Sequence, residues 1–274
     1  MAAPSMRVGD VEVQGLSDGV LKTSVDLVIG MDRAQAAQLI GSADGSVVIP
    51  VNNFLIRRGG RVILIDAGAG NTMQPTLGKL PANLRANGVE PTAVTHIVMT
   101  HLHPDHANGL VDDAGNPHYP NAEIVVHETE ADFWTRPDVA NDEDRVKGNR
   151  ARTKKNLQPY LDRIRRVREG EEFSGFIPVL APGHTPGHTC WLLASGSSGF
   201  MAFGDVVHLS AIQISHPHAA LTYDLDKNLA VKSRKRILEM AASERFAIAG
   251  AHVNAPGFGY VVRKGASFDF EPAG

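Results

Sequence analysis

The sequence predicts one layered α/β domain that spans residues 1–274. Strand-like segments occupy both halves of the chain, and helical segments flank them in each half, a pattern typical of sheets covered by helices. No internal repeat, low-complexity tract or proline- and glycine-rich linker divides the chain, and its length suits one large domain. Residues 1–45 are expected to be an N-terminal extension that packs on the fold or on the partner in a homodimer.

Runs rich in valine and isoleucine predict the strands of the first half. Residues 46–56 and 61–65 flank the turn Arg57-Arg58-Gly59-Gly60, which predicts a hairpin. A short helix is expected from Pro81 to Gly88, because proline is tolerated at the first helical position and glycine follows helix ends. Further elements are expected as strands at 11–16, 94–99 and 123–126, and as a helix carrying Glu130, Phe133 and Trp134.

The second half opens with a charged segment, residues 138–168. Four acids come first, and ten Lys or Arg lie between Arg145 and Arg168. This pattern predicts either a basic face for an acidic partner or a solvated helical segment, and the compensating acids favour the second. Beyond it, strands are expected at 176–180, 189–193, 199–203 and 246–249, and an amphipathic helix at 226–242.

Composition excludes several functional classes. With 27 Lys+Arg against 30 Asp+Glu, the chain is not a strongly cationic nucleic-acid binder. The single cysteine, Cys190, excludes an intramolecular disulfide framework and a cysteine-rich zinc module. No apolar run approaches the roughly 18–20 residues of a membrane span. Residues 1–10 lack the pattern of an export signal, so we expect a cytoplasmic protein without nucleic-acid or membrane partners.

The strongest motif is His101-Leu102-His103-Pro104-Asp105-His106, directly after the strand expected at 94–99. Four potential metal ligands occupy six residues of one loop. A lone histidine would carry little weight, but this density favours a metal site over a polar loop. Imidazole with carboxylate suits zinc, and also iron, manganese or cobalt.

Three later groups place further donors after expected strands. His184 lies in a loop rich in proline and glycine, Asp205 follows Gly204, and His252 follows Gly250-Ala251. Each group alone is a weak signal. Together they place donors at successive strand ends, where a layered sheet protein forms its site.

With these motifs in this order, the chain resembles the metallo-β-lactamase superfamily. Its H-x-H-x-D-H motif is met by His101, His103, Asp105 and His106, and its later ligands fall on His184, Asp205 and His252. The turn Asp66-Ala67-Gly68 looks like the turn behind the family's metal site. The resemblance runs from residue 46 to residue 260. It implies a four-layered αββα sandwich, the metallo-β-lactamase fold, with two metal ions at one edge of its sheets.

The resemblance also implies how the donors are shared. His101, His103 and His184 would hold the first ion, and Asp105, His106 and His252 the second, with Asp205 bridging both. Seven donors exceed the four of one tetrahedral zinc, whereas two open zinc sites sharing one carboxylate use all seven. We therefore expect two divalent metal ions, with zinc favoured over the other metals.

This site implies a dinuclear metal-dependent hydrolase. A metal-bridging hydroxide would attack a lactone, an aryl ester or an organophosphate triester, and Asp105 could pass a proton to the leaving group. A β-lactamase or thioesterase activity on the same metal centre, and a diiron oxidoreductase, are the alternatives. A hydrolase is favoured over a binding protein because all seven ligands are present.

Several stretches resemble the methyl parathion hydrolase branch of the superfamily, among them 131–134, 204–208 and 252–259. In that branch aromatic side chains line an apolar pocket, so Phe133, Trp134 and Phe258 are the candidates here. Periodicity alone equally allows Phe133 and Trp134 to be core residues. The chain departs from the branch at Asn254-Ala255.

His208 stands three residues after Asp205, where quorum-quenching lactonases of the superfamily usually have tyrosine. Its imidazole could orient or protonate a leaving oxygen, or it could hydrogen-bond to a metal ligand, and the sequence leaves both open. Asp66 and His188 are expected to lie behind the ligands and to support them.

Overall fold

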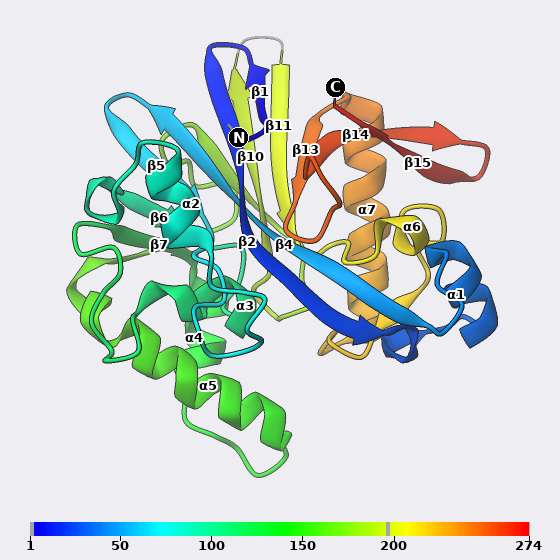
Figure 1. The fold of residues 1–274 in the computed structure, drawn as a ribbon, viewed down its shortest axis with the longest axis horizontal. Coiled ribbons are helices and arrows are strands. Elements are labelled where there is room, and N and C mark those ends of the chain that lie inside the picture. The colour runs from blue at the N-terminus through cyan, green and yellow to red at the C-terminus, as the bar shows by residue number, and fades with distance from the viewer. Residues whose placement is uncertain (1–2, 196–197, 274) are drawn as a thin grey trace.

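The computed structural model describes residues 3–195 and 198–273. Within them, the strands form two large sheets and one two-stranded sheet. The two large sheets lie between two layers of helices (Figure 1). The layered α/β domain predicted from the sequence is confirmed, and so is the four-layered αββα arrangement that the family resemblance implied.

The first large sheet has, in the described chain, seven strands in the order β1-β2-β4-β5-β6-β7-β8. Their bounds are β1 Ser5–Val8, β2 Val11–Ser24, β4 Ser46–Arg58, β5 Arg61–Ile65, β6 His96–Val98, β7 Glu123–His127 and β8 Ile164–Val167. β4 and β5 pair antiparallel with Arg58 opposite Arg61, so the predicted hairpin is confirmed. From β5 to β8 the neighbours are parallel.

The second large sheet has six strands in the described ranges, in the order β15-β14-β13-β11-β10-β9. Their bounds are β9 Phe176–Leu180, β10 Thr189–Ser195, β11 Ser198–Gly204, β13 Ala247–Gly250, β14 Phe258–Lys264 and β15 Ser267–Pro272. β11 and β13 are parallel, and the other pairs are antiparallel. The small sheet joins β3 Val28–Ile29 to β12 Ala220–Leu221.

Helices cover the outer faces of both large sheets. Their bounds are α1 Arg33–Ile40, α2 Leu80–Ala86, α3 Pro104–Ala107, α4 Glu128–Thr135, α5 Asp144–Leu157, α6 Ser210–Gln213 and α7 Lys227–Glu244, with 3-10 turns η1 Val25–Leu27, η2 Pro91–Ala93, η3 Asn108–Leu110 and η4 Gln158–Arg163. Leu84 of α2 and Trp134 of α4 pack in one cluster with Leu64 and Ile97 of the first sheet. α7 covers the second sheet in the same way. No described helix has both the length and the apolar character needed to cross a membrane.

The two sheets pack face to face through a second apolar cluster. Ile63 and Val98 of the first sheet and Trp191 of the second belong to it, and all three are fully buried. Successive side chains of a strand point to opposite faces, so Leu64 and Ile97 reach the helices while Ile63 and Val98 reach the other sheet. Burial of this apolar area is the main force that holds the layers together.

One segment was assigned to the wrong kind of element, and several elements were not predicted, among them β1, α1, β3 and β12. Residues 164–167, expected within a solvated helical segment, form the edge strand β8. The exposed Arg165 and Arg166 gave this strand its polar character, and charges are typical of edge strands, which they protect from pairing with other chains. β14 and β15, which form a hairpin after His252, were not predicted.

The N-terminal segment is built into the fold of its own chain. β2 pairs with β4 from Val13 to Ser24, and the two long strands run side by side across Figure 1. Val25 and Ala36 are buried in a cluster with Ile49 and Ile212. A homodimer contact through this segment stays a prediction.

Candidate metal centre

The histidine-rich loop follows β6 and enters the short helix α3. His101 and His103 lie in the loop, and Asp105 and His106 lie in α3. The three histidines are buried, although histidine is polar. Buried polar groups of this kind need hydrogen-bond or metal partners. The three histidines therefore indicate a buried binding site at the end of β6.

The other donors reach the same place from the second sheet. His184 lies in the β9–β10 loop, Asp205 directly follows β11, and His252 follows β13. Gly183 has φ +128, and a Cβ there would lie 2.1 Å from the backbone nitrogen of Ala230. Glycine therefore lets this loop pass close to α7 and turn His184 inward.

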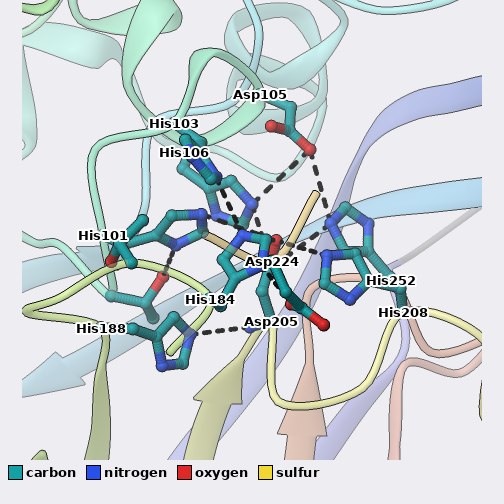
Figure 2. Close-up of polar contacts among 12 residues, drawn as sticks. His101, His103, Asp105, His106, His184, His188, Asp205, His208, Asp224 and His252 are labelled. Carbon is teal, nitrogen blue, oxygen red and sulfur yellow. Dashed lines mark hydrogen bonds and ion pairs between the residues drawn. The ribbon is translucent and has the colours of Figure 1, made fainter. Parts of the chain in front are cut away.

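Asp205 lies at the centre of the cluster (Figure 2). Its Oδ2 is 3.1 Å from His184 Nε2 and 3.5 Å from His101 Nε2. Its Oδ1 is 3.1 Å from His106 Nε2 and 3.3 Å from His252 Nε2. The two oxygens of one carboxylate thus face two different pairs of imidazoles.

The donors form overlapping groups that could each hold a cation. Within each group the ligand atoms lie within 4.8 Å of one another: His101, His103, His184 and Asp205 in one, Asp105, His106 and His252 in another, and Asp205, His208 and His252 in a third. The structure thus brings together all seven residues expected to be ligands, and adds His208 beside them.

The unsatisfied atoms of the cluster fit bound metal ions. The Nε2 atoms of His101 and His106 and Oδ1 of Asp205 are buried without a hydrogen-bond partner. His103 Nδ1 and His184 Nε2 face each other at 2.8 Å. Buried polar atoms left unpaired are costly, whereas cations between these nitrogens and carboxylate oxygens would satisfy them. The donor set, imidazole with carboxylate, is one that binds zinc.

Residues behind the cluster fix the orientation of its rings. Asp66 contacts His106 Nδ1 at 2.8 Å and accepts hydrogen bonds from Thr100, and Asp224 contacts His184 Nδ1 at 3.0 Å. His188 Nε2 accepts a hydrogen bond from the backbone nitrogen of Asp205 at 2.9 Å. The two carboxylate contacts turn the Nε2 atoms of His106 and His184 toward Asp205, and the contact of His188 fixes the backbone of Asp205. Asp66 and His188 thus lie where the sequence placed them, while Asp224 was missed.

Glu130 was also missed as a site residue. Its carboxylate is fully buried and accepts four hydrogen bonds, from Leu102 N, Trp134 Nε1, Thr185 Oγ1 and Gly187 N, at 2.6–3.1 Å. Burial raises the pKa of Glu130, and these four donors oppose the rise. Glu130 therefore joins the loop of His101 and His103 to the loop of His184. The only sequence signal was an acid four residues before Trp134 on a helix.

His208 lies directly against Asp205. Its Nε2 is 3.0 Å from Asp205 Oδ2, and its ring stacks on His252 with the ring centroids 5.0 Å apart. The Oε1 of Gln213 accepts a hydrogen bond from the backbone nitrogen of His208. Burial lowers the pKa of His208 to about 4, so its ring is neutral near pH 7.

A cavity of about 270 Å³ opens over the cluster. Asp105, His184, Asp205, His208 and His252 form its floor. Its walls include the aliphatic side chains Leu21, Ile49 and Met73 and the polar side chains Lys22, Arg145, Asn149 and Tyr223.

None of the three aromatic residues predicted for the substrate pocket lines this cavity. Trp134 is fully buried in the helix layer, with its ring edge-on to His103. Phe133 lies under the guanidinium groups of Arg136 and Arg150 and lines a separate hollow. Phe258 is buried between the two sheets. The prediction was wrong because a run of aromatic residues does not show which side of α4 or β14 each one occupies.

Comparisons with known proteins agree with this geometry. A family model described as the metallo-beta-lactamase superfamily matches residues 47–252. The uncharacterized protein YobT of Bacillus subtilis (strain 168) is 25% identical over 206 residues, which are 72% of this chain and 81% of YobT. The N-acyl homoserine lactonase AiiA of Bacillus thuringiensis subsp. kurstaki is 26% identical over 164 residues, 59% of this chain and 57% of AiiA.

Solved structures match over the whole chain. The hydrolase AbOPH, described as a member of the beta lactamase superfamily, has a TM-score of 0.94 and 30% identity, covering 100% of this chain and 98% of its own. The dizinc quorum-quenching lactonase AidC has a TM-score of 0.93 and 26% identity with the same coverage. These matches do not single out the methyl parathion hydrolase branch, which stays a prediction. The fold, the donor cluster and the family model agree: the chain belongs to the metallo-β-lactamase superfamily.

Proposed function

We propose that this protein is a dinuclear metal-dependent hydrolase of ester-type substrates, with a lactone or another carboxylic ester as its substrate. The observation that carries the proposal is the position of Asp205, whose two oxygens face two groups of buried donors. Two relatives support it by their names, since AiiA is an N-acyl homoserine lactonase and AidC is a dizinc quorum-quenching lactonase.

In this proposal the seven donors hold two zinc ions. His101, His103 and His184 belong to one ion, Asp105, His106 and His252 to the other, and Asp205 to both. Bound zinc lowers the pKa of water and polarises a carbonyl oxygen. We propose zinc because three or four imidazole and carboxylate donors, with a position left open, are typical of its catalytic sites.

In this proposal, side chains of the protein transfer protons and orient the substrate. Hydrolysis adds water across the acyl C–O bond and leaves a carboxylic acid and an alcohol. Asp105 lines the cavity floor, where its carboxylate can take a proton from the attacking water and pass it to the leaving oxygen. The ring of His208 lines the same floor, with its Nε2 3.0 Å from Asp205 Oδ2. When a metal ion takes that carboxylate oxygen, the Nε2–H of the neutral ring can donate a hydrogen bond to a substrate oxygen instead.

The cavity walls favour a carboxylic ester over a phosphotriester. The aromatic residues that suggested an organophosphate pocket lie outside the cavity, and aliphatic side chains take their place. Aliphatic walls suit the acyl or alkyl part of a lactone or ester, which is buried through its apolar area.

The first test compares four substrates on one metal-loaded preparation: an aliphatic lactone, an aryl ester, a methyl phosphotriester and a chromogenic cephalosporin. We expect the lactone or the aryl ester to give the highest kcat/KM, chelation to abolish turnover, and zinc to restore it. Elemental analysis should find two zinc ions per chain. A preference for the phosphotriester or the cephalosporin, or turnover that survives full chelation, would contradict the proposal.

A second test concerns His208. We expect His208→Ala to lower kcat by about 100-fold, the usual scale for losing one hydrogen-bond donor to an oxygen that gains charge in the transition state, while the chain keeps two zinc ions. Asp205 keeps its other imidazole contacts, so the metal groups stay intact. If the variant instead loses one ion, His208 is a metal ligand and its proposed contact with substrate is wrong.

A further inference from the structure

The wall of the cavity over the metal centre has an aliphatic side. Leu21 of β2 and Ile49 of β4 are paired across the two strands, so their side chains are neighbours at the cavity wall. Met73 lies beside them, and 41% of it is exposed. Its loop is held to β2 by two hydrogen bonds between the Gln74 side chain and the backbone of Lys22. This side fits a hydrocarbon segment of a substrate.

The other side of the wall is polar and comes from α5. Arg145 and Asn149 stand four residues apart, so they share one face of the helix, and both line the cavity. Arg145 Nη2 donates a hydrogen bond to the backbone oxygen of Thr222 at 3.4 Å. This contact holds the guanidinium beside Tyr223, which also lines the cavity.

The charge of Arg145 is not neutralised by the acids around it. Asp142 pairs with Arg136 and Arg150, Asp138 pairs with Arg150, and Asp144 pairs with Lys147. Among the described residues, Arg145 has no ion pair. Lys22, a second cation at the cavity, likewise has none in the described chain. Within the described chain, the cavity thus has at its wall two cations without an ion pair.

We propose that the cavity selects an ester or lactone whose hydrocarbon chain carries a carboxylate, and that Arg145 binds that carboxylate. The guanidinium is planar and matches a carboxylate with two parallel hydrogen bonds. The hydrocarbon segment lies against Leu21, Ile49 and Met73, while the ester group reaches the floor of the cavity. This inference deepens the proposed function, on which it rests, by naming a substrate class.

The test uses two γ-lactones with side chains of equal length, one ending in a methyl group and the other in a carboxylate. The metal-loaded full chain is expected to have the higher kcat/KM for the carboxylate lactone, with an advantage that falls as ionic strength rises. Arg145→Met should lower the ratio of the two kcat/KM values by about tenfold or more, the scale of a charge-assisted hydrogen bond. The matched control is Arg152→Met, which removes an exposed arginine of the same helix outside this cavity and should leave the ratio unchanged.

The outcomes separate the two proposals. If the neutral lactone is hydrolysed as well as the carboxylate lactone and Arg145→Met leaves the ratio unchanged, the inference about Arg145 fails while the hydrolase stands. If neither these lactones nor the aryl ester is hydrolysed, the proposed function fails, and calorimetry with the two ring-opened hydroxy acids decides the inference. Tighter binding of the dicarboxylate that is lost in Arg145→Met supports it, and equal binding of both acids overturns it.

Discussion

Asp205→Asn is expected to lower kcat/KM on a lactone or aryl ester by at least about 10³-fold, since in the proposed function its carboxylate serves both metal ions and several kcal/mol of catalysis depend on them. The substitution keeps the shape of the side chain but removes the negative charge that faces five imidazoles. We expect elemental analysis to show fewer than two zinc ions per chain.

The control for this prediction is Asp162→Asn, the same chemical change at an exposed residue of η4. It should leave activity and zinc content as they are. If Asp205→Asn kept two tightly bound ions and most of its activity, the bridging role of Asp205 would be wrong.

Glu130→Ala is expected to destabilise the metal-free chain by about 3 kcal/mol or more, because it leaves four buried donors without their acceptor and each such loss costs about 1–3 kcal/mol. The hydrogen bonds join the loops on both sides of the first metal position, so zinc affinity should fall as well. Chemical denaturation and competitive zinc titration measure the two effects.

Glu128→Ala on the same helix is the matched control. Its carboxylate is part of a solvent-exposed pair with Arg168, and such pairs contribute little. If Glu130→Ala does not fold, Glu130→Gln tests the same idea, because its amide NH₂ cannot accept from the donors that face it. Wild-type stability and zinc affinity in Glu130→Gln would show that Glu130 does not hold the loops together.

The sequence predicted the candidate metal ligands better than the residues that orient them, because four of the ligands lie close together in the sequence. His101, His103, Asp105 and His106 lie within six residues, so their spacing alone was informative. Glu130 and Asp224 reach the cluster from helix α4 and from the loop before α7. Single acids in such positions look like ordinary surface residues until the fold places them inside.

The cavity could not be predicted for a related reason. Its walls come from β2, β4, the loop around Met73, α5 and Tyr223 after β12, five segments that are separated along the chain. No periodicity links Leu21 to Arg145. The aromatic residues near the motifs were a stronger local signal, yet Trp134 and Phe258 face the apolar layers, where their large areas stabilise packing.

Four of the wall segments, β2, β4, the loop around Met73 and α5, are distinct from the loops that carry the donors, and this separation bears on how the protein can change over evolutionary time. Exchanges at Leu21, Met73 or Arg145 leave the contacts of Asp66, Glu130 and Asp224 untouched. The metal centre can therefore stay unchanged while substitutions in the cavity wall change which acyl group the cavity accepts. A scaffold divided in this way can acquire a new substrate through a few wall substitutions, without passing through an inactive ancestor.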